Sequence, residues 1–161
     1  MAKELRIILG IDPGFGRLGW GVIRASGSSL SCLGYGCIET HSTEEFATRL
    51  ALIDRELALI IEKYNPTDIS VEELFFAKNV KTAMQVAHAR GVVLLRAVNH
   101  CGNIFEYKPN QIKQAITGTG SADKKQIQFM ITRILALEKT PKPDDAADAL
   151  AIAVTHSAYI R

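Results

Sequence analysis

The sequence predicts an α/β fold with a mixed five-stranded sheet flanked by helices, in which three antiparallel strands are followed by parallel ones. Two observations predict it. The first 40 residues contain three short apolar runs separated by turn residues. After them, helical and strand-like segments alternate, which is typical of parallel strands joined by helices. Because the chain has 161 residues and 47% are hydrophobic, residues 1–161 are expected to form one domain around one core.

Three strands are expected in the first 40 residues. The run Leu5–Asp12 is apolar and β-branched, and Pro13 and Gly14 stop it. Two further runs follow, Gly19–Arg24 and Leu30–Glu39, with Gly and Ser between them. Short strands separated by such turn residues predict an antiparallel meander.

The hydrophobic period becomes helical after residue 42. Apolar residues recur at three- and four-residue spacing as far as Tyr64. Ser42 and Glu45 have the spacing of a capping box, so a helix is expected to start there and to end before Pro66. The remaining expected elements are strand Ile69–Glu72, helix Asn79–His100, strand Ile104–Lys108, and helices Pro109–Ile116, Ala122–Leu137 and Pro143–Tyr159.

Composition argues against a membrane or secreted protein. No stretch approaches the roughly 20 apolar residues needed to cross a bilayer, and the charged start Met1–Arg6 lacks a signal peptide's apolar segment. A cytoplasmic protein is therefore expected. Cys32, Cys37 and Cys101 are odd in number and lack the paired short spacings of a zinc site, so buried free thiols are expected.

The positive charge is concentrated in one part of the chain. Net charge is +2, but residues 77–142 hold eleven basic and three acidic side chains, a local charge of +8. Such a segment can be an ordinary solvated surface. It can also bind a polyanion such as nucleic acid, because Lys and Arg contacts to phosphates dominate such binding.

Four carboxylates are the candidate catalytic and metal-binding residues. Asp12 ends the first strand, before a glycine-rich turn. Glu72 ends a later strand, where sites form in α/β folds. Asp145 and Asp148 share a face at the start of the last helix. Each also has a structural explanation, as a turn residue, an exposed strand-end acid or a helix cap; Asp144 is the expected cap, which would leave Asp145 and Asp148 free.

Carboxylates that converge repel one another and are costly to desolvate unless a cation lies between them. Oxygen ligands suit Mg²⁺ or Mn²⁺, and two such ions roughly 4 Å apart can activate a water and stabilise the leaving oxygen of a phosphodiester. If the four acids converge, a metal-dependent phosphodiesterase is expected. Their spacing alone leaves the convergence open.

Three motifs occur in a fixed order along the chain. They are Gly10–Gly14 followed by Gly19–Gly21, Val71–Phe75 followed by Ala77–Asn79, and Asp144–Ala151 followed by Thr155 and His156. With these motifs the chain resembles, over essentially its full length, the RuvC family of bacterial Holliday-junction resolvases. The resemblance implies a ribonuclease H-like fold and a homodimer that nicks two strands of a four-way DNA junction during recombination and repair. It further implies Mg²⁺, or plausibly Mn²⁺, with two ions per subunit, and partnership with the branch-migration proteins RuvA and RuvB.

The resemblance also implies roles for single residues. Asp12, Glu72, Asp145 and Asp148 match the family's metal-binding catalytic carboxylates, although some members carry His at the position of Asp145. The basic and aromatic residues expected to contact DNA are Lys78, Lys113, Lys124, Lys125 and Phe75. Two of the lysines, Lys113 and Lys124, fall where the family keeps basic residues beside the scissile DNA, and Phe75 falls where an aromatic contacts unstacked bases.

Several expectations from the residues stay open. Phe75 can instead be buried core, and the lysines can be solvated helix surface. The loop Gly118–Ser121 can approach the DNA backbone, or it can end one helix and supply Ser121 as the next N-cap. The histidines His88, His100 and His156 are expected to be structural. His156 would lie about 12 Å along the helix from Asp148, which is too far to bind the same metal.

The long helix Asn79–His100 is the candidate subunit contact. Its apolar side chains are Val86, Val92, Val93, Leu94 and Val98. Two other functional classes remain: a nucleotide-binding ATPase or sugar-kinase-like domain, whose glycine turn after a strand-end Asp is similar, and a junction-binding module without catalysis. The first normally needs two domains around the nucleotide, and this chain has room for one.

Overall fold

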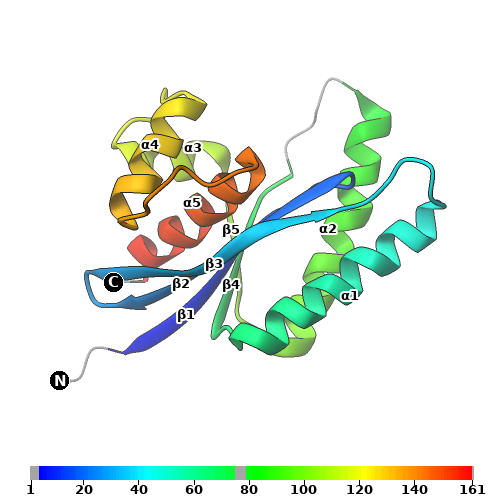
Figure 1. Ribbon diagram of the computed structural model, residues 1–161, viewed down its shortest axis with the longest axis horizontal. Helices are drawn as coiled ribbons and strands as arrows, with labels where there is room; N and C mark the ends of the chain where they lie inside the picture. Colours follow the sequence, from blue (N-terminus) through cyan, green and yellow to red (C-terminus); the bar gives the residue numbers. More distant parts are fainter. Residues whose placement is uncertain (1–3, 75–78, 161) are drawn as a thin grey trace.

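The computed structural model describes residues 4–74 and 79–160, and in them five strands form one sheet with helices on both faces (Figure 1). The strands are β1 (Leu5–Asp12), β2 (Arg17–Ser26), β3 (Ser29–Glu39), β4 (Asp68–Glu72) and β5 (Ile104–Tyr107). The helices are α1 (Phe46–Tyr64), α2 (Val80–His100), α3 (Pro109–Thr117), α4 (Lys124–Ile134) and α5 (Asp144–Tyr159).

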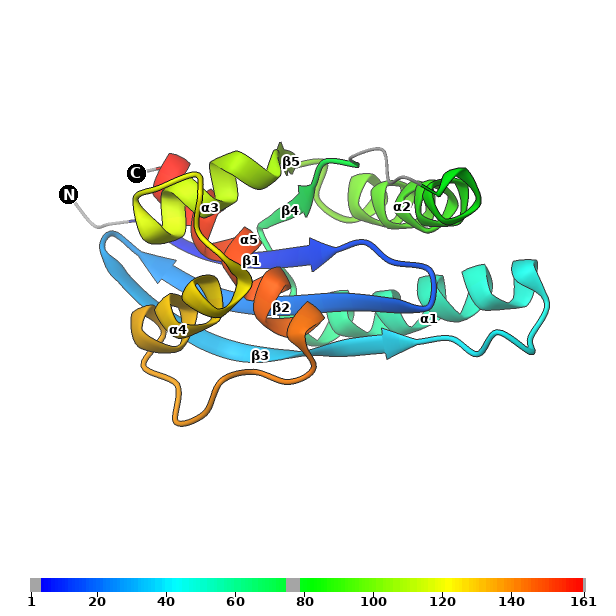
Figure 2. The same ribbon diagram turned by 90° about the horizontal axis from the view of Figure 1, so that it is seen from above.

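The sheet has the mixed topology that the sequence predicts. Its strand order is β3-β2-β1-β4-β5, with β1, β2 and β3 antiparallel and β4 and β5 parallel to β1. Helices α1 and α2 cover one face, whereas α3, α4 and α5 cover the other (Figures 1 and 2). The predicted α/β fold with three antiparallel strands followed by parallel ones is therefore confirmed.

Side chains of the central strand alternate between two cores, as strand geometry requires. Leu9 and Ile11 are fully buried against α1 and α2. Ile8, the residue before Leu9, points the other way and is fully buried on the side of α3, α4 and α5. Asp12 continues the second series, so the strand directs its carboxylate toward the α5 side of the sheet.

The start of α1 differs from the prediction. The helix begins at Phe46, and its N-cap is Glu45, whose side chain makes no capping hydrogen bond. The Ser42 capping box is absent because the preceding residues form a turn of their own. In that turn the Glu44 N–H donates to the His41 carbonyl, and the Glu44 carboxylate accepts from the His41 N–H.

Two caps around α4 also differ from the prediction. Asp123, and not Ser121, is the N-cap, and it forms a reciprocal capping box with Gln126. The helix ends at Ile134 because Ala136 adopts a left-handed conformation (φ 49°). The Leu137 N–H donates to the Thr132 carbonyl and the Ala136 N–H to the Arg133 carbonyl, the two bonds of a Schellman motif.

The expected capping role of Asp144 is wrong. Pro143 occupies the N-cap of α5 and Asp144 is the first helical residue. The Asp144 carboxylate accepts instead from Lys142 at 3.3 Å, and the pKa of Asp144 is lowered, chiefly by that bond. Its negative charge still favours the positive end of the helix dipole.

No helix within the two described ranges combines the length and apolarity needed to span a bilayer. The cysteines Cys32, Cys37 and Cys101 are free thiols, as expected, but each is half-buried where full burial was expected.

Candidate active site

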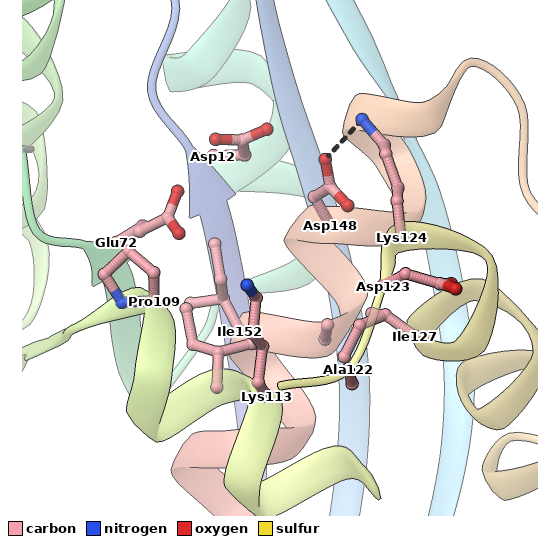
Figure 3. Close-up of a pocket in the computed structure, with 12 residues that line it drawn as sticks. Asp12, Glu72, Pro109, Lys113, Ala122, Asp123, Lys124, Ile127, Asp148 and Ile152 are labelled. Atoms are coloured by element: carbon pink, nitrogen blue, oxygen red, sulfur yellow. Dashed lines mark ion pairs between the residues drawn. The ribbon is translucent and has the colours of Figure 1, made fainter. Parts of the chain in front are cut away.

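Five of the predicted residues line one hollow of about 300 Å³ on the α5 side of the sheet. Figure 3 shows the carboxylates of Asp12, Glu72 and Asp148 and the amino groups of Lys113 and Lys124 around it. They come from five elements: β1, β4, α5, α3 and α4. Residues separated by more than 130 positions therefore meet at one place.

Parallel pairing of β1 and β4 explains why Asp12 and Glu72 meet. The register pairs Ile11 with Val71, so the next residue of each strand lies at the same edge of the sheet. Ile11 and Val71 are both buried toward α1 and α2. Because side chains alternate along a strand, Asp12 and Glu72 both face α5.

Helix α5 reaches the site because glycines let its backbone lie directly on the sheet. A Cβ on Gly10 would clash with the Ala149 carbonyl and lie 2.7 Å from the Ala153 nitrogen. A Cβ on Gly19 would clash with the carbonyl of Asp145. The absence of side chains at these glycines therefore brings the first two turns of α5 close to β1 and β2.

The three carboxylates disfavour one another's charge. The pKa of Asp12 is raised well above its usual value, first by burial and then by the charges of Glu72, Asp148 and Asp145. Burial and the Asp148 charge likewise raise the pKa of Glu72, opposed by a hydrogen bond with Asp12 and by Lys113 and Lys124. A bound cation would relieve both the burial penalty and the repulsion.

Lys124 partly supplies that positive charge. Its Nζ lies 3.2 Å from Oδ2 of Asp148 and 3.7 Å from Oδ2 of Asp144. Burial raises the pKa of Asp148 and Lys124 opposes that increase. Burial also lowers the pKa of Lys124, but the Asp148 charge and hydrogen bond outweigh it, so the net shift is upward.

Asp145 lies at the border of the site and does not line the hollow. Its Oδ2 is 3.6 Å from Nη1 of Arg17, at the start of β2. Its charge nevertheless helps to raise the pKa of Asp12. The sequence analysis did not identify Arg17; the only sequence signal was a basic residue in the glycine-rich turn after Asp12.

The remaining predicted DNA-binding residues lie elsewhere. Lys125 lines a separate hollow of about 400 Å³ beside Thr117 and Phe129. Phe75 and Lys78 fall outside the described residues, so their predicted roles stay predictions.

The histidines do not line the hollow, in agreement with their expected structural role. His156 is fully buried and its Nδ1 lies 2.7 Å from the Tyr107 hydroxyl. His100 contacts the Pro66 carbonyl at 3.0 Å, and the His88 ring packs edge-on against a phenylalanine.

Among the described residues, the charged groups of this hollow that can bind a metal are carboxylates, whose hard oxygen atoms fit a hard divalent cation such as Mg²⁺ or Mn²⁺. As they stand, no three Asp, Glu, His or Cys side chains of the described ranges are close enough together to hold a metal ion. The arrangement brings together half-buried acids, two lysines and an open cavity, which is suited to binding a phosphodiester with a cation.

Comparison with known proteins gives the same family from sequence and from structure. The family model described as crossover junction endodeoxyribonuclease RuvC matches residues 8–156. A protein of that name from Alkaliphilus oremlandii is 55% identical over 151 residues, 94% of this chain and 92% of the relative. One from Natranaerobius thermophilus is 48% identical, covering 96% of each chain. The solved structure of T. thermophilus RuvC in complex with a Holliday junction substrate superposes with a TM-score of 0.92 at 34% identity, covering 97% of this chain and 95% of that one. The chain therefore belongs to the RuvC family of crossover junction endodeoxyribonucleases.

Proposed function

We propose that this protein resolves four-way DNA junctions by paired, symmetric, metal-dependent nicks in two strands during recombination and repair. One observation carries the proposal: Asp12, Glu72 and Asp148 line a single open hollow together with Lys113 and Lys124. Membership of the RuvC family supports it, as does the close structural similarity to a relative solved with a junction.

The acids of the hollow are the proposed metal ligands. Asp12, Glu72 and Asp148 would hold Mg²⁺ or Mn²⁺, two ions per subunit, with Asp145 joining them from the border of the site. When bound, such ions lower the pKa of water and stabilise the developing charge on the leaving oxygen. The metal-free site raises the pKa of Asp12 and of Glu72, so metal binding would compete with protonation of these acids.

Lys113 and Lys124 are proposed to neutralise charge on the scissile phosphate. Figure 3 shows the amino group of Lys113 directed into the hollow, and that of Lys124 paired with Asp148. When Asp148 instead pairs with a cation, Lys124 becomes available to the phosphate. Lys125 and the predicted residues Lys78 and Phe75 would contact DNA beyond the cleavage point.

A homodimer is proposed, because two-fold symmetry would place identical sites on equivalent strands of a junction. Of the predicted contact residues, Val93 is buried inside the subunit and Val98 is 52% exposed. The exposed face of α2 instead presents Met84 (59% exposed), Leu95 (63%) and Val98, with exposed Gly91 between them. A Leu95→Glu substitution is expected to give monomers by analytical ultracentrifugation; a dimer that persists would place the contact elsewhere.

A synthetic four-way junction tests the function. The protein is incubated with the junction and with a linear duplex of the same sequence, with and without Mg²⁺, and the nicks are mapped. We expect symmetric, ligatable nicks in two strands of the junction alone, only with the metal. Binding without nicking at any Mg²⁺ or Mn²⁺ concentration would favour a binding module; ATP hydrolysis without an effect on junctions would favour the ATPase-like alternative.

A further inference from the structure

Three polar side chains of β4 face α5 in register. Asp68, Ser70 and Glu72 alternate along the strand, and the residues between them, Ile69 and Val71, are buried on the opposite face. Two residues of a strand advance about 6.7 Å and four residues of a helix about 6 Å. A strand and an antiparallel helix can therefore stay in register over two such steps, that is, over three positions.

The partners of the three side chains are spaced four residues apart on α5 and run in the opposite direction to β4, from His156 back to Asp148. Asp68 lies against His156, with 3.5 Å between Oδ2 and Nε2. The Ser70 hydroxyl donates to the Ile152 carbonyl at 3.4 Å. Glu72 shares the active-site hollow with Asp148, whose charge raises the pKa of Glu72. The candidate metal ligands thus form one end of a series whose other end is the buried contact between Asp68 and His156.

The buried end connects four elements. Asp68 and His156 are both fully buried. Arg6, on β1, donates from Nη1 to both Asp68 oxygens, at 3.1 and 3.0 Å. On the other side of the ring, the Tyr107 hydroxyl lies 2.7 Å from Nδ1 of His156, and the Phe105 ring packs against the imidazole at 4.1 Å between centroids.

The contacts define one protonation pattern. Nε2 of His156 faces the Asp68 carboxylate, an acceptor, so the ring proton belongs on Nε2. Nδ1 then accepts from the Tyr107 hydroxyl. Burial lowers the pKa of His156, which favours this neutral ring, and the charge of the nearby Asp68 opposes part of that decrease. In this pattern Arg6 donates to Asp68, the Nε2 proton of His156 points toward Asp68, and the Tyr107 hydroxyl donates to Nδ1 of His156.

The contacts of His156 are compatible with only one register of α5 along β4. A shift of α5 by one residue would rotate His156 by about 100° and remove it from both partners. Asp68 would keep only Arg6, and the Tyr107 hydroxyl would be buried without a partner, which is unfavourable for a polar group. Glu72 and Tyr107 are direct neighbours in the β4–β5 register, so the network contacts the strand position that carries the catalytic acid.

We propose that Asp68, His156 and Tyr107 are positioning residues that fix the register of α5 along β4 and thereby hold Asp148 opposite Glu72 for metal binding. The proposal rests on the proposed metal-dependent nuclease function. None of the three residues lines the hollow, so they would act through the placement of Asp148.

Tyr107→Phe is the most conservative test, because it removes one hydroxyl and keeps the ring. Mn²⁺ binding is measured without DNA by isothermal titration calorimetry and by the metal-induced rise in Tm. We expect the dissociation constant for Mn²⁺ to increase about threefold to tenfold and the metal-induced rise in Tm to shrink. Nicking should require correspondingly more Mg²⁺ for half-saturation and approach the parent rate at saturating Mg²⁺. His156→Gln, which can donate toward Asp68 but lacks the second ring nitrogen, should act in the same direction.

Tyr159→Phe is the matched control. Tyr159 lies on α5, as His156 does, and its ring centroid is 5.1 Å from that of Tyr107. It is 55% exposed, and its hydroxyl is outside the network. It should leave metal binding unchanged. The positioning role would be overturned if Tyr107→Phe and His156→Gln bound Mn²⁺ like the parent. In that case their Tm would be lower than the parent's by the same amount with and without metal. A parent protein that binds Mn²⁺ but nicks no junction would overturn the proposed function and leave the register test valid.

Discussion

The two faces of the sheet bury different kinds of side chain. Under α1 and α2 the core is aliphatic, with fully buried residues such as Ile53, Leu57 and Val93. Under α5 the core also encloses polar groups, among them Asp68, Ser70, Thr155 and His156. The same five strands support both faces. The aliphatic face contributes stability through burial alone, whereas the α5 face also holds charges whose positions decide the chemistry. Substitutions on the two faces should therefore have separable effects.

The largest expected effect is on the α5 face. Asp12→Asn should lower Mg²⁺-dependent nicking of a four-way junction by at least about 10³-fold, equivalent to about 4 kcal/mol, because it removes a proposed metal ligand. Junction affinity, measured by electrophoretic mobility shift without metal, should stay within about twofold of the parent. Nicking that persists at the parent rate would contradict the assignment of Asp12.

The opposite face should give the reverse pattern. Leu57→Ala removes a fully buried side chain, so the free energy of unfolding in urea should fall by about 2–5 kcal/mol. At a temperature where the variant remains folded, its nicking rate and half-saturating Mg²⁺ concentration should match those of the parent. A changed Mg²⁺ requirement in the folded variant would show that the two faces are coupled.

Lys124→Ala should separate metal binding from catalysis. Lys124 pairs with Asp148, so its removal should tighten Mn²⁺ binding measured without DNA. Loss of a positive charge beside the phosphate should at the same time lower the nicking rate at saturating Mg²⁺ by about 10²-fold. Lys125→Ala is the control for the Mn²⁺-binding measurement, which contains no DNA, because Lys125 lines a different hollow. Weaker Mn²⁺ binding by Lys124→Ala would contradict the competition between lysine and metal.

The smallest expected effect concerns pH and stability. Because the folded-state pKa of Asp12 is raised, the folded protein binds more protons than the unfolded chain at pH values between the two pKa values. In metal-free buffer, stability should therefore decrease as pH rises from about 4 through the raised pKa. Asp12→Asn removes this contribution and should raise Tm near neutral pH by about 2–4 °C, close to 1 kcal/mol for a chain of this length. An equal Tm for variant and parent in EDTA at pH 7.5 would argue against the repulsion.

The sequence was sufficient to predict the mixed sheet and the position of Asp12 and Glu72 at strand ends, but it left their convergence open. Both acids end strands, and parallel pairing places such ends at one edge of a sheet. The ion pairs were beyond prediction, because they depend on how helices from distant parts of the chain pack. Lys124 reaches Asp148, and Arg17 holds Asp145 at the border of the hollow, through contacts that no local pattern contains.

Helix ends were predicted less well than helix interiors. Ser42 and Asp144 are good capping residues by type, but the turn before Phe46 and the position of Pro143 decided where α1 and α5 begin. Ala136 gave no signal for the end of α4, since the left-handed position after a helix is usually glycine. These errors arose because turn geometry overrode residue preference.

The glycines under α5 determine where the site can vary. Opposite Gly10 and Gly19 the helix backbone touches strand backbone, so no substitution on β1 or β2 can add a side chain there without lifting the helix. Along β4 the spacing to α5 is set by side chains, Asp68 and Ser70 among them. Small differences in ligand spacing between homologous enzymes should therefore originate on β4. To change the preferred metal, Ser70 is the position to substitute, because a different side chain there would move β4, which carries Glu72, and α5, which carries Asp148, apart by fractions of an ångström.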